Sequence, residues 1–388
     1  MSGSPLEDAL RRQSVLVCVG AGGVGKTTIS ASLGLRAASG ENRSALVCTI
    51  DPARRLANSL GLSELGNAET RISEEIFEQS NVPTGAPLHA MMLDMKRTWD
   101  ELVERHAPPE ARERIFASRF YQSLSTRLAG SQEYIAMEKL SQLRARSDYQ
   151  LVVLDTPPTA HALDFLEAPN RVLDFLDNDA ARWLLSPARS AGKLGFKMLS
   201  KGGSYALKTL SRFTGADMLE EMAAFLLSIS TLNESFRERA REVRALLAAE
   251  STSFVVVTIP SPERLDEVIH FHTLLQQNEM NVAAIVVNRI HPSPTAEQFA
   301  DARRVPQPLR SRVEDTLEEM RAVAIHDALA IAELRRECDP TPLVLVPRFE
   351  RDVHDLAALW ETSRYLVGDV RVPAGGVQLD GAPASGAP

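Results

Sequence analysis

The sequence predicts an α/β protein in which a mostly parallel β-sheet is covered by helices on both faces and carries an inserted helical subdomain. Short apolar runs recur along the chain, and segments of helix length mostly separate them. Strands of a parallel sheet are buried on both faces and are therefore apolar along their whole length, as these runs are. The runs are Val15–Val19, Ala45–Ile50, Leu88–Leu93, Leu151–Leu154, Phe254–Ile259, Ala283–Val287 and Leu343–Val346.

Two long intervals interrupt this alternation and predict the helical subdomain. Met95–Arg146 and Glu167–Glu250 contain no strand-like run and are rich in helix formers, with charges at helical spacing. The expected boundaries are 1–13 for a disordered N-terminus, 14–94, 130–166 and 251–368 for the sheet-containing core, 95–129 and 167–250 for the helical subdomain, and 369–388 for a disordered tail rich in Gly, Pro and Ala.

Composition excludes several classes of protein. The 388 residues include 44% apolar and 24% charged residues, which is typical of a globular protein. With 43 basic and 51 acidic residues, the formal charge of −8 argues against general binding to nucleic acid. Cys18, Cys48 and Cys338 lie far apart and form no CxxC pair, so neither a disulfide framework nor a zinc clamp is expected. Without a secretory signal or a long apolar span, the chain is expected to be cytoplasmic.

A phosphate-binding loop lies between the first apolar run and a helical stretch from Lys26 to about Ser39. Gly20–Thr27 reads GAGGVGKT and satisfies G-x-x-x-x-G-K-[ST] in the strand–loop–helix context that the motif requires. Backbone N–H groups of such a loop surround a phosphate, the lysine neutralises the β- and γ-phosphate oxygens, and the threonine hydroxyl ligates Mg²⁺. The motif predicts a P-loop NTPase that uses a nucleoside triphosphate and Mg²⁺. Its expected binding residues are Gly20, Gly22, Gly23, Val24, Gly25, Lys26, Thr27 and Thr28.

Two acidic residues follow apolar strands and complete the expected catalytic set. Asp51 lies just beyond the second run, where it would orient the attacking water. Asp155 ends the run LVVLD and would hold Mg²⁺ together with Thr27, through a water molecule. Either aspartate could alternatively cap a helix at a strand–helix junction, as aspartates commonly do.

Three motifs together resemble the ArsA-type, or guided-entry, ATPase family. They are the loop GAGGVGKTT, the segment TIDPA at Thr49–Ala53, and DTPPTAHALDFL at Asp155–Leu166. The family includes arsenical-pump ATPases and targeting factors for tail-anchored membrane proteins. The resemblance extends in order over most of residues 14–365.

The resemblance implies roles for further residues. TIDPA resembles switch I, with Asp51 as the water-orienting acid, and DTPPTAH resembles switch II. The expected switch residues are Asp155, Thr159 and His161, and the expected adenine-site residues are Asn288, Pro347 and Arg348, with Glu267 as a further base-site position. In this family two subunits meet across the nucleotides, and hydrolysis opens and closes a helical lobe.

This sequence departs from the family pattern at three points. Family members usually carry a second lysine in the loop, which reaches the partner's nucleotide, and here that position is Ala21. The zinc-binding CxxC of eukaryotic members is absent. The helical lobe also lacks the cysteines that an arsenite site needs. These departures leave open a homodimer with a substitute residue, a heterodimer with a paralogue, or a slow switch.

The helical lobe carries two candidate partner surfaces. Residues 180–216 contain seven basic residues and no acidic residue: Arg182, Arg189, Lys193, Lys197, Lys201, Lys208 and Arg212. Residues 218–232 form an apolar stripe rich in Met and Leu. Such segments suit a membrane surface or a hydrophobic helical client, although a solvated face and an ordinary helix core are the alternative interpretations.

The leading hypothesis is therefore an Mg²⁺-dependent ATPase whose dimer controls a client-binding helical lobe. The first alternative is a slow or inactive nucleotide-gated scaffold subunit of a heterodimer. An arsenite-efflux ATPase and a partition-type ATPase are disfavoured by the missing cysteines and by the net charge, respectively.

Overall fold

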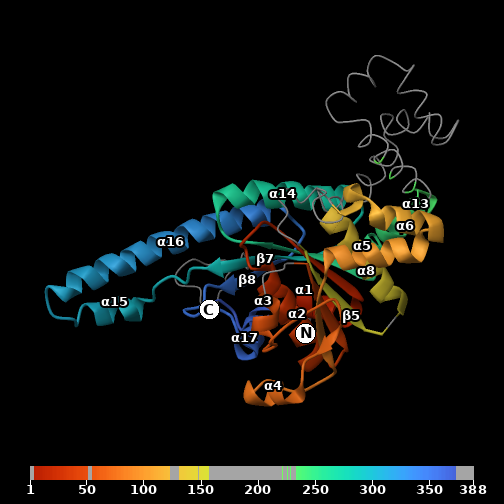
Figure 1. The fold of residues 1–388 in the computed structure, drawn as a ribbon. Coiled ribbons are helices and arrows are strands. Elements are labelled where there is room, and N and C mark those ends of the chain that lie inside the picture. The colour runs from red at the N-terminus through yellow and green to blue at the C-terminus, as the bar shows by residue number, and fades with distance from the viewer. Residues whose placement is uncertain are drawn as a thin grey trace. The chain divides into compact units, whose positions relative to one another are not determined.

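The computed structural model describes residues 4–50, 55–122, 131–146, 148–156, 221, 225, 228 and 233–372 (Figure 1). The chain divides into two compact units. The first, here called the sheet unit, comprises Met1–Met92, Arg146–Leu163 and Leu247–Pro388, and the second, the helical unit, comprises Leu93–Ala145 and Asp164–Leu246.

The sheet unit is built on an eight-stranded sheet in the order β3-β4-β2-β5-β1-β6-β7-β8. Its strands are β1 (Val15–Val19), β2 (Ala45–Thr49), β3 (Thr70–Arg71), β4 (Leu88–Met92), β5 (Leu151–Asp155), β6 (Thr252–Thr258), β7 (Val282–Ile290) and β8 (Leu343–Pro347). Neighbouring strands are parallel except at the β3–β4 edge. The predicted α/β class with a mostly parallel sheet is confirmed, since each apolar run forms a strand. The short, polar β3 has no such run and was not predicted.

Helices cover both faces of this sheet. Helices α2 (Lys26–Ser39) and α17 (Leu356–Leu366) share one apolar core with β1, in which Leu16 and Cys18 are fully buried. Helices α14 (Pro262–Gln277) and α16 (Leu309–Glu337) pack on the other side, against β6 and β7 respectively. Because helices shield both surfaces, the central strands can be apolar at every position.

The N-terminus corrects an expectation, because most of residues 1–13, predicted to be disordered, form helix α1 (Pro5–Arg12). Leu6, Ala9 and Leu10 are buried in the same core as α2, and their spacing of three and four residues places them on one helical face. Pro5 suits the first turn of the helix, and Ser4 Oγ donates a hydrogen bond to Leu366 O at 3.2 Å. The prediction was wrong because the segment is mostly polar, and its few apolar residues were not interpreted as one face of a helix.

The described part of the helical unit contains helices and no strand. These are α5 (Met95–His106), α6 (Pro109–Ala117), α8 (Ser131–Arg146) and α13 (Asn233–Leu247). The expected boundaries placed residues 130–146 with the sheet, whereas α8 groups with the helical unit almost to its end. Two of its charged residues contact other helices of this unit: buried Glu138 pairs with Arg239 of α13, and Lys139 Nζ lies 3.8 Å from Glu101 Oε2 of α5.

Three short helices complete the described sheet unit: α3 (Arg55–Ser59), α4 (Glu74–Gln79) and α15 (Ala296–Ala302). Figure 1 shows α16 extending beyond the sheet, with α15 packed beside it. Among the described residues, the exposed large apolar side chains all belong to α16, namely Leu309, Met320, Val323, Ile325 and Leu329. None of the described helices has the length and apolarity needed to cross a membrane.

The packing of α1 predicts that Leu10→Ala will lower the free energy of unfolding by about 2–5 kcal/mol, since the fully buried side chain leaves a cavity. Chemical denaturation measures this loss. Arg12→Ala on the exposed face of α1 is the control and should change stability by no more than about 0.5 kcal/mol. Equal effects of the two substitutions would contradict the packed helix.

Candidate nucleotide-binding site

The predicted motifs meet at one edge of the sheet because their strands are neighbours. β5 pairs in parallel with β1 on one side and with β2 on the other. Asp155, the last residue of β5, is in register with Cys18 of β1 and Thr49 of β2. The loop that begins at Gly20 follows β1 directly. Loop, Asp155 and Thr49 therefore converge at the carboxyl end of the sheet, where open α/β sheets bind ligands.

The first glycine of the loop allows the chain to pass close to β6. Gly20 has φ +147°, and a β-carbon there would lie 2.1 Å from Val257 O. A backbone oxygen cannot move aside as a flexible side chain can, so this position requires glycine. Gly25, with φ +99°, is the N-cap of α2, whose first residues line the cavity described below. The first N–H groups of a helix have no acceptor within the helix, so a helix N-terminus favours an anion.

Lys26 holds the loop in its curved form. Its side chain is buried, and Nζ donates hydrogen bonds to Gly20 O at 2.7 Å and Ala21 O at 2.9 Å. The ammonium group is thus surrounded by loop backbone at the start of α2. Both the charge and its position fit the phosphate-binding role predicted from the motif.

A hydrogen-bonded cluster joins the loop to the two neighbouring strands. Thr27 Oγ1 and Thr49 Oγ1 each donate to Asp155 Oδ2 at 2.7 Å. Asp155 is 1% exposed, and Thr156 Oγ1 donates to Cys18 O at 2.8 Å beside it. A carboxylate and a hydroxyl are the oxygen donors that Mg²⁺ prefers, so the residues present fit this metal. Burial raises the pKa of Cys18 to about 12, and its thiol therefore adds no charge near Asp155.

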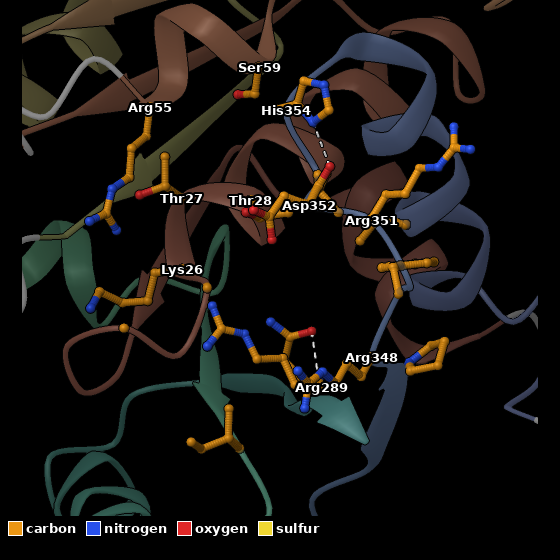
Figure 2. A pocket seen from close by; sticks show the side chains of 18 of the residues that line it. Lys26, Thr27, Thr28, Arg55, Ser59, Arg289, Arg348, Arg351, Asp352 and His354 are labelled. Carbon is orange, nitrogen blue, oxygen red and sulfur yellow. Dashed lines mark hydrogen bonds between the residues drawn. The ribbon is translucent and has the colours of Figure 1, made fainter. Parts of the chain in front are cut away.

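The loop lines a cavity of about 1060 Å³ within the sheet unit (Figure 2). The other walls come mainly from residues 347–354, from α3, and from Asn288, Arg289 and His291. The described lining residues include five cationic residues, Lys26, Arg55, Arg289, Arg348 and Arg351, and three acidic residues, Asp327, Glu350 and Asp352. In a chain with a net negative charge, this local excess of cations suits a polyanionic ligand such as a nucleoside triphosphate.

The predicted adenine-site residues Asn288, Pro347 and Arg348 lie around the same cavity. Asn288 is buried, its Nδ2 donates to Val24 O at 2.8 Å, and its Oδ1 accepts from Arg289 N at 2.9 Å. Arg348 N donates to Ile290 O at 2.8 Å, and Pro347 and Arg348 both line the cavity. Asn288 therefore connects β7 to the phosphate loop, and its adenine-reading role remains a prediction.

A β-bulge occurs at the end of β7, immediately after Asn288. Val287 pairs with Leu345 and Ile290 with Pro347, so three steps on β7 match two on β8. The extra residue lets Arg289 adopt φ +59°, a left-handed conformation that costs a residue other than glycine about 1–2 kcal/mol. Its side chain is exposed and lines the cavity.

Sequence reasoning missed a polar chain at the cavity wall. His291 Nδ1 lies 2.9 Å from Oδ2 of buried Asp327 on α16, and Arg348 Nη1 lies 3.1 Å from His291 Nε2. An arginine only donates, so His291 Nε2 accepts, and its Nδ1–H donates to Asp327. These residues are widely separated in the chain, and no local spacing indicated that they meet.

Comparison with known proteins identifies the family. A family model described as anion-transporting ATPase matches residues 13–333. The chain belongs to the anion-transporting ATPase family. The ATPase GET3 of Podospora anserina is 26% identical over 321 residues, covering 81% of this chain and 85% of the relative. The ATPase GET3 of Malassezia globosa is 28% identical over 302 residues, covering 77% and 80% respectively. The ATPase GET3B of Arabidopsis thaliana is 27% identical over 313 residues, covering 74% and 67%.

Membership of the anion-transporting ATPase family confirms the resemblance predicted from the motifs, and the chain is an ATPase. Several predicted residues lie outside the described part of the structure, namely Asp51, Thr159, His161, residues 180–216 and most of 218–232. Glu267 lies on α14, pairs with Arg264 at 3.0 Å, and is not among the cavity residues. All three cysteines are buried, and none of them forms a disulfide.

The loop geometry predicts different outcomes for two glycine substitutions. Gly20→Ala should weaken ATP binding at least tenfold, because its β-carbon collides with Val257 O and displaces the loop. Gly23→Ala should cost only about 1 kcal/mol of strain, because Gly23 has φ +79° but no atom lies within 4 Å of its β-carbon position. Titration with a fluorescent ATP analogue measures both, and equal losses would contradict the close approach of Gly20 to β6.

Proposed function

We propose that this ATPase converts ATP to ADP and phosphate with Mg²⁺ and works as a dimer whose opening and closing controls a client-binding helical lobe. The observation that carries the proposal is the 2.7 Å hydrogen bond between Thr27 Oγ1 and Asp155 Oδ2. It unites the hydroxyl at the start of α2 with the strand-end carboxylate, which is the pair that magnesium nucleotide sites use.

Each residue of the cluster has one role in this proposal. Lys26 neutralises charge on the β- and γ-phosphates, while Thr27 and Asp155 hold the metal, Asp155 through water. Bound Mg²⁺ would offset negative charge on the phosphate oxygens. Asp51 orients the attacking water from the segment that follows β2. Thr49, in register with Asp155, keeps the carboxylate directed toward Thr27.

Selection of adenine is assigned to Asn288, Pro347 and Arg348. An amide can both donate to and accept from the edge of a base, and Asn288 lies at the cavity wall beside the phosphate loop. Pro347 ends β8 and lines the same space, which supports a packing role against the purine. Thr159 and His161 are assigned to the switch that responds to the γ-phosphate.

The proposed partners are a second subunit, either a copy of this chain or a paralogue, and a hydrophobic helical client or membrane surface contacted through residues 180–232. In the described part of that stretch, Phe225 is buried and stacks on Phe120 with ring centroids 6.2 Å apart. Phe225 thus belongs to the core of the helical unit. The other apolar residues of the stripe are assigned to the client surface, and the protein to the cytoplasm.

Lys26→Ala is expected to lower the rate of ATP hydrolysis by about 10²–10³-fold or more, because the phosphates lose their buried cation. Phosphate release by the purified protein measures the rate. Arg12→Ala on the exposed face of α1 serves as the control and should retain full activity. An undiminished rate of hydrolysis for Lys26→Ala would contradict the phosphate-binding role assigned to Lys26.

Client binding is tested by affinity purification of the hydrolysis-blocked Asp51→Asn variant in ATP. We expect membrane-protein segments to co-purify with Asp51→Asn in ATP but not in ADP, because only the closed state holds a client. A paralogue recovered alone would favour the heterodimer and contradict the client role.

A slow nucleotide-gated subunit is the second candidate function, and Ala21 favours it. Without the loop lysine, no cation at that position reaches a partner's nucleotide, and a transition-state cation in trans is worth about 10³–10⁵ in rate. This candidate predicts negligible turnover by the isolated chain and a large acceleration by a lysine-bearing paralogue. Brisk hydrolysis by the isolated chain would remove it.

A further inference from the structure

We propose that Arg289 binds the phosphate chain of the nucleotide within its own subunit, supplying a cation to a loop that carries Ala21. This inference rests on the proposed function, because it concerns the same site. It adds to that site a residue that no motif indicated.

The backbone at Arg289 is the first observation. Left-handed backbone at a residue other than glycine is uncommon, and such strain persists where the surroundings impose it, often at ligand sites. Here the β7 bulge imposes φ +59° and sends the arginine side chain to the cavity wall. A regular strand would shift the alternation of side chains by one residue and change the face on which this side chain lies.

The connection to the phosphate loop is the second observation. Arg289 N donates to Asn288 Oδ1 at 2.9 Å, and Asn288 Nδ2 donates to Val24 O at 2.8 Å. Gly25 leaves room for this contact, since a β-carbon there would lie 2.3 Å from Asn288 Nδ2. One buried side chain therefore fixes the backbone of Arg289 relative to the loop that receives the phosphates.

The charge of Arg289 is the third observation. Within the described residues, no carboxylate forms an ion pair with its guanidinium, whereas arginines outside the cavity such as Arg264 and Arg304 pair with neighbouring acids. Arg348, at the same wall, is engaged with His291 at 3.1 Å. Figure 2 shows Arg289 and Lys26 around the same space. A guanidinium matches phosphate geometry with two parallel hydrogen bonds and keeps its charge at any physiological pH.

The experiment compares ligands that share adenosine and differ in phosphate number. Dissociation constants for ATP, ADP and AMP are measured by displacement of a fluorescent nucleotide from the full-length chain. Arg289→Asn removes the cation but tolerates the left-handed backbone, and Arg289→Gly removes both the cation and the strain. For both variants we expect affinity for ATP to fall about tenfold or more, ADP less, and AMP hardly at all.

The matched control is Glu279, which has φ +57° in the turn after α14 and does not line the cavity. Glu279→Gly and Arg289→Gly should both leave the thermal unfolding midpoint equal to or above that of the unmodified chain. Only Arg289→Gly should weaken ATP binding. Arg289→Lys, which restores a cation without the planar fork, should recover part of the affinity.

Three results would overturn the proposal. Equal losses for ATP, ADP and AMP would place the guanidinium on the part that the three ligands share, adenosine with its first phosphate, and not on the β- and γ-phosphates. No loss of affinity for either variant would show that Arg289 does not contact the nucleotide. In both cases an unmodified chain that binds ATP leaves the proposed function intact. If the unmodified chain binds none of the three ligands, the proposed function fails together with the role of Arg289.

Discussion

The hydrogen bonds that two threonines donate to one carboxylate oxygen of Asp155 are the constraint on which the site depends. Thr27 belongs to the helix after β1, Thr49 ends β2, and Asp155 ends the strand between them. The three meet only if β5 is parallel to both neighbours and in the observed register. The apolar packing on both faces of the sheet holds these strands in register. It therefore also fixes the relative positions of Thr27, Thr49 and Asp155 at the edge of the sheet.

Two energetically unfavourable features occur together at this edge of the sheet. Cationic side chains concentrate around one cavity, and a strained residue, Arg289, lies beside the loop. Natural proteins retain such features where the surrounding structure overdetermines them. Here the surroundings are the β7–β8 pairing, the buried Asn288 and the glycines that let backbone and side chain approach. The free energy gained by packing the helix-covered core offsets the repulsion between the cations and the backbone strain at the site.

Much of the sheet unit was predictable because its signals are local. Apolar runs indicate strands, and the phosphate-loop motif indicates a strand before it and a helix after it. The features that escaped prediction depend on neighbours distant in sequence. Leu6 and Leu10 needed the core of α2 and α17 to become a packed helix, and the contacts among His291, Asp327 and Arg348 join three separate elements. The bulge at Arg289 likewise arises from a shift in register between β7 and β8, and the sequence of either strand alone does not indicate it.

The order of the units along the chain gives β5 a particular position. The chain passes between the two units near residues 92, 145, 163 and 246, and the middle two passages flank β5. In sequence, β5 is therefore the strand that lies between the two parts of the helical unit. It is also a central strand, hydrogen-bonded to β1 on one side and to β2 on the other. Because β5 ends in Asp155, the carboxylate assigned to the metal lies on the strand that the two segments of the helical unit enclose in sequence.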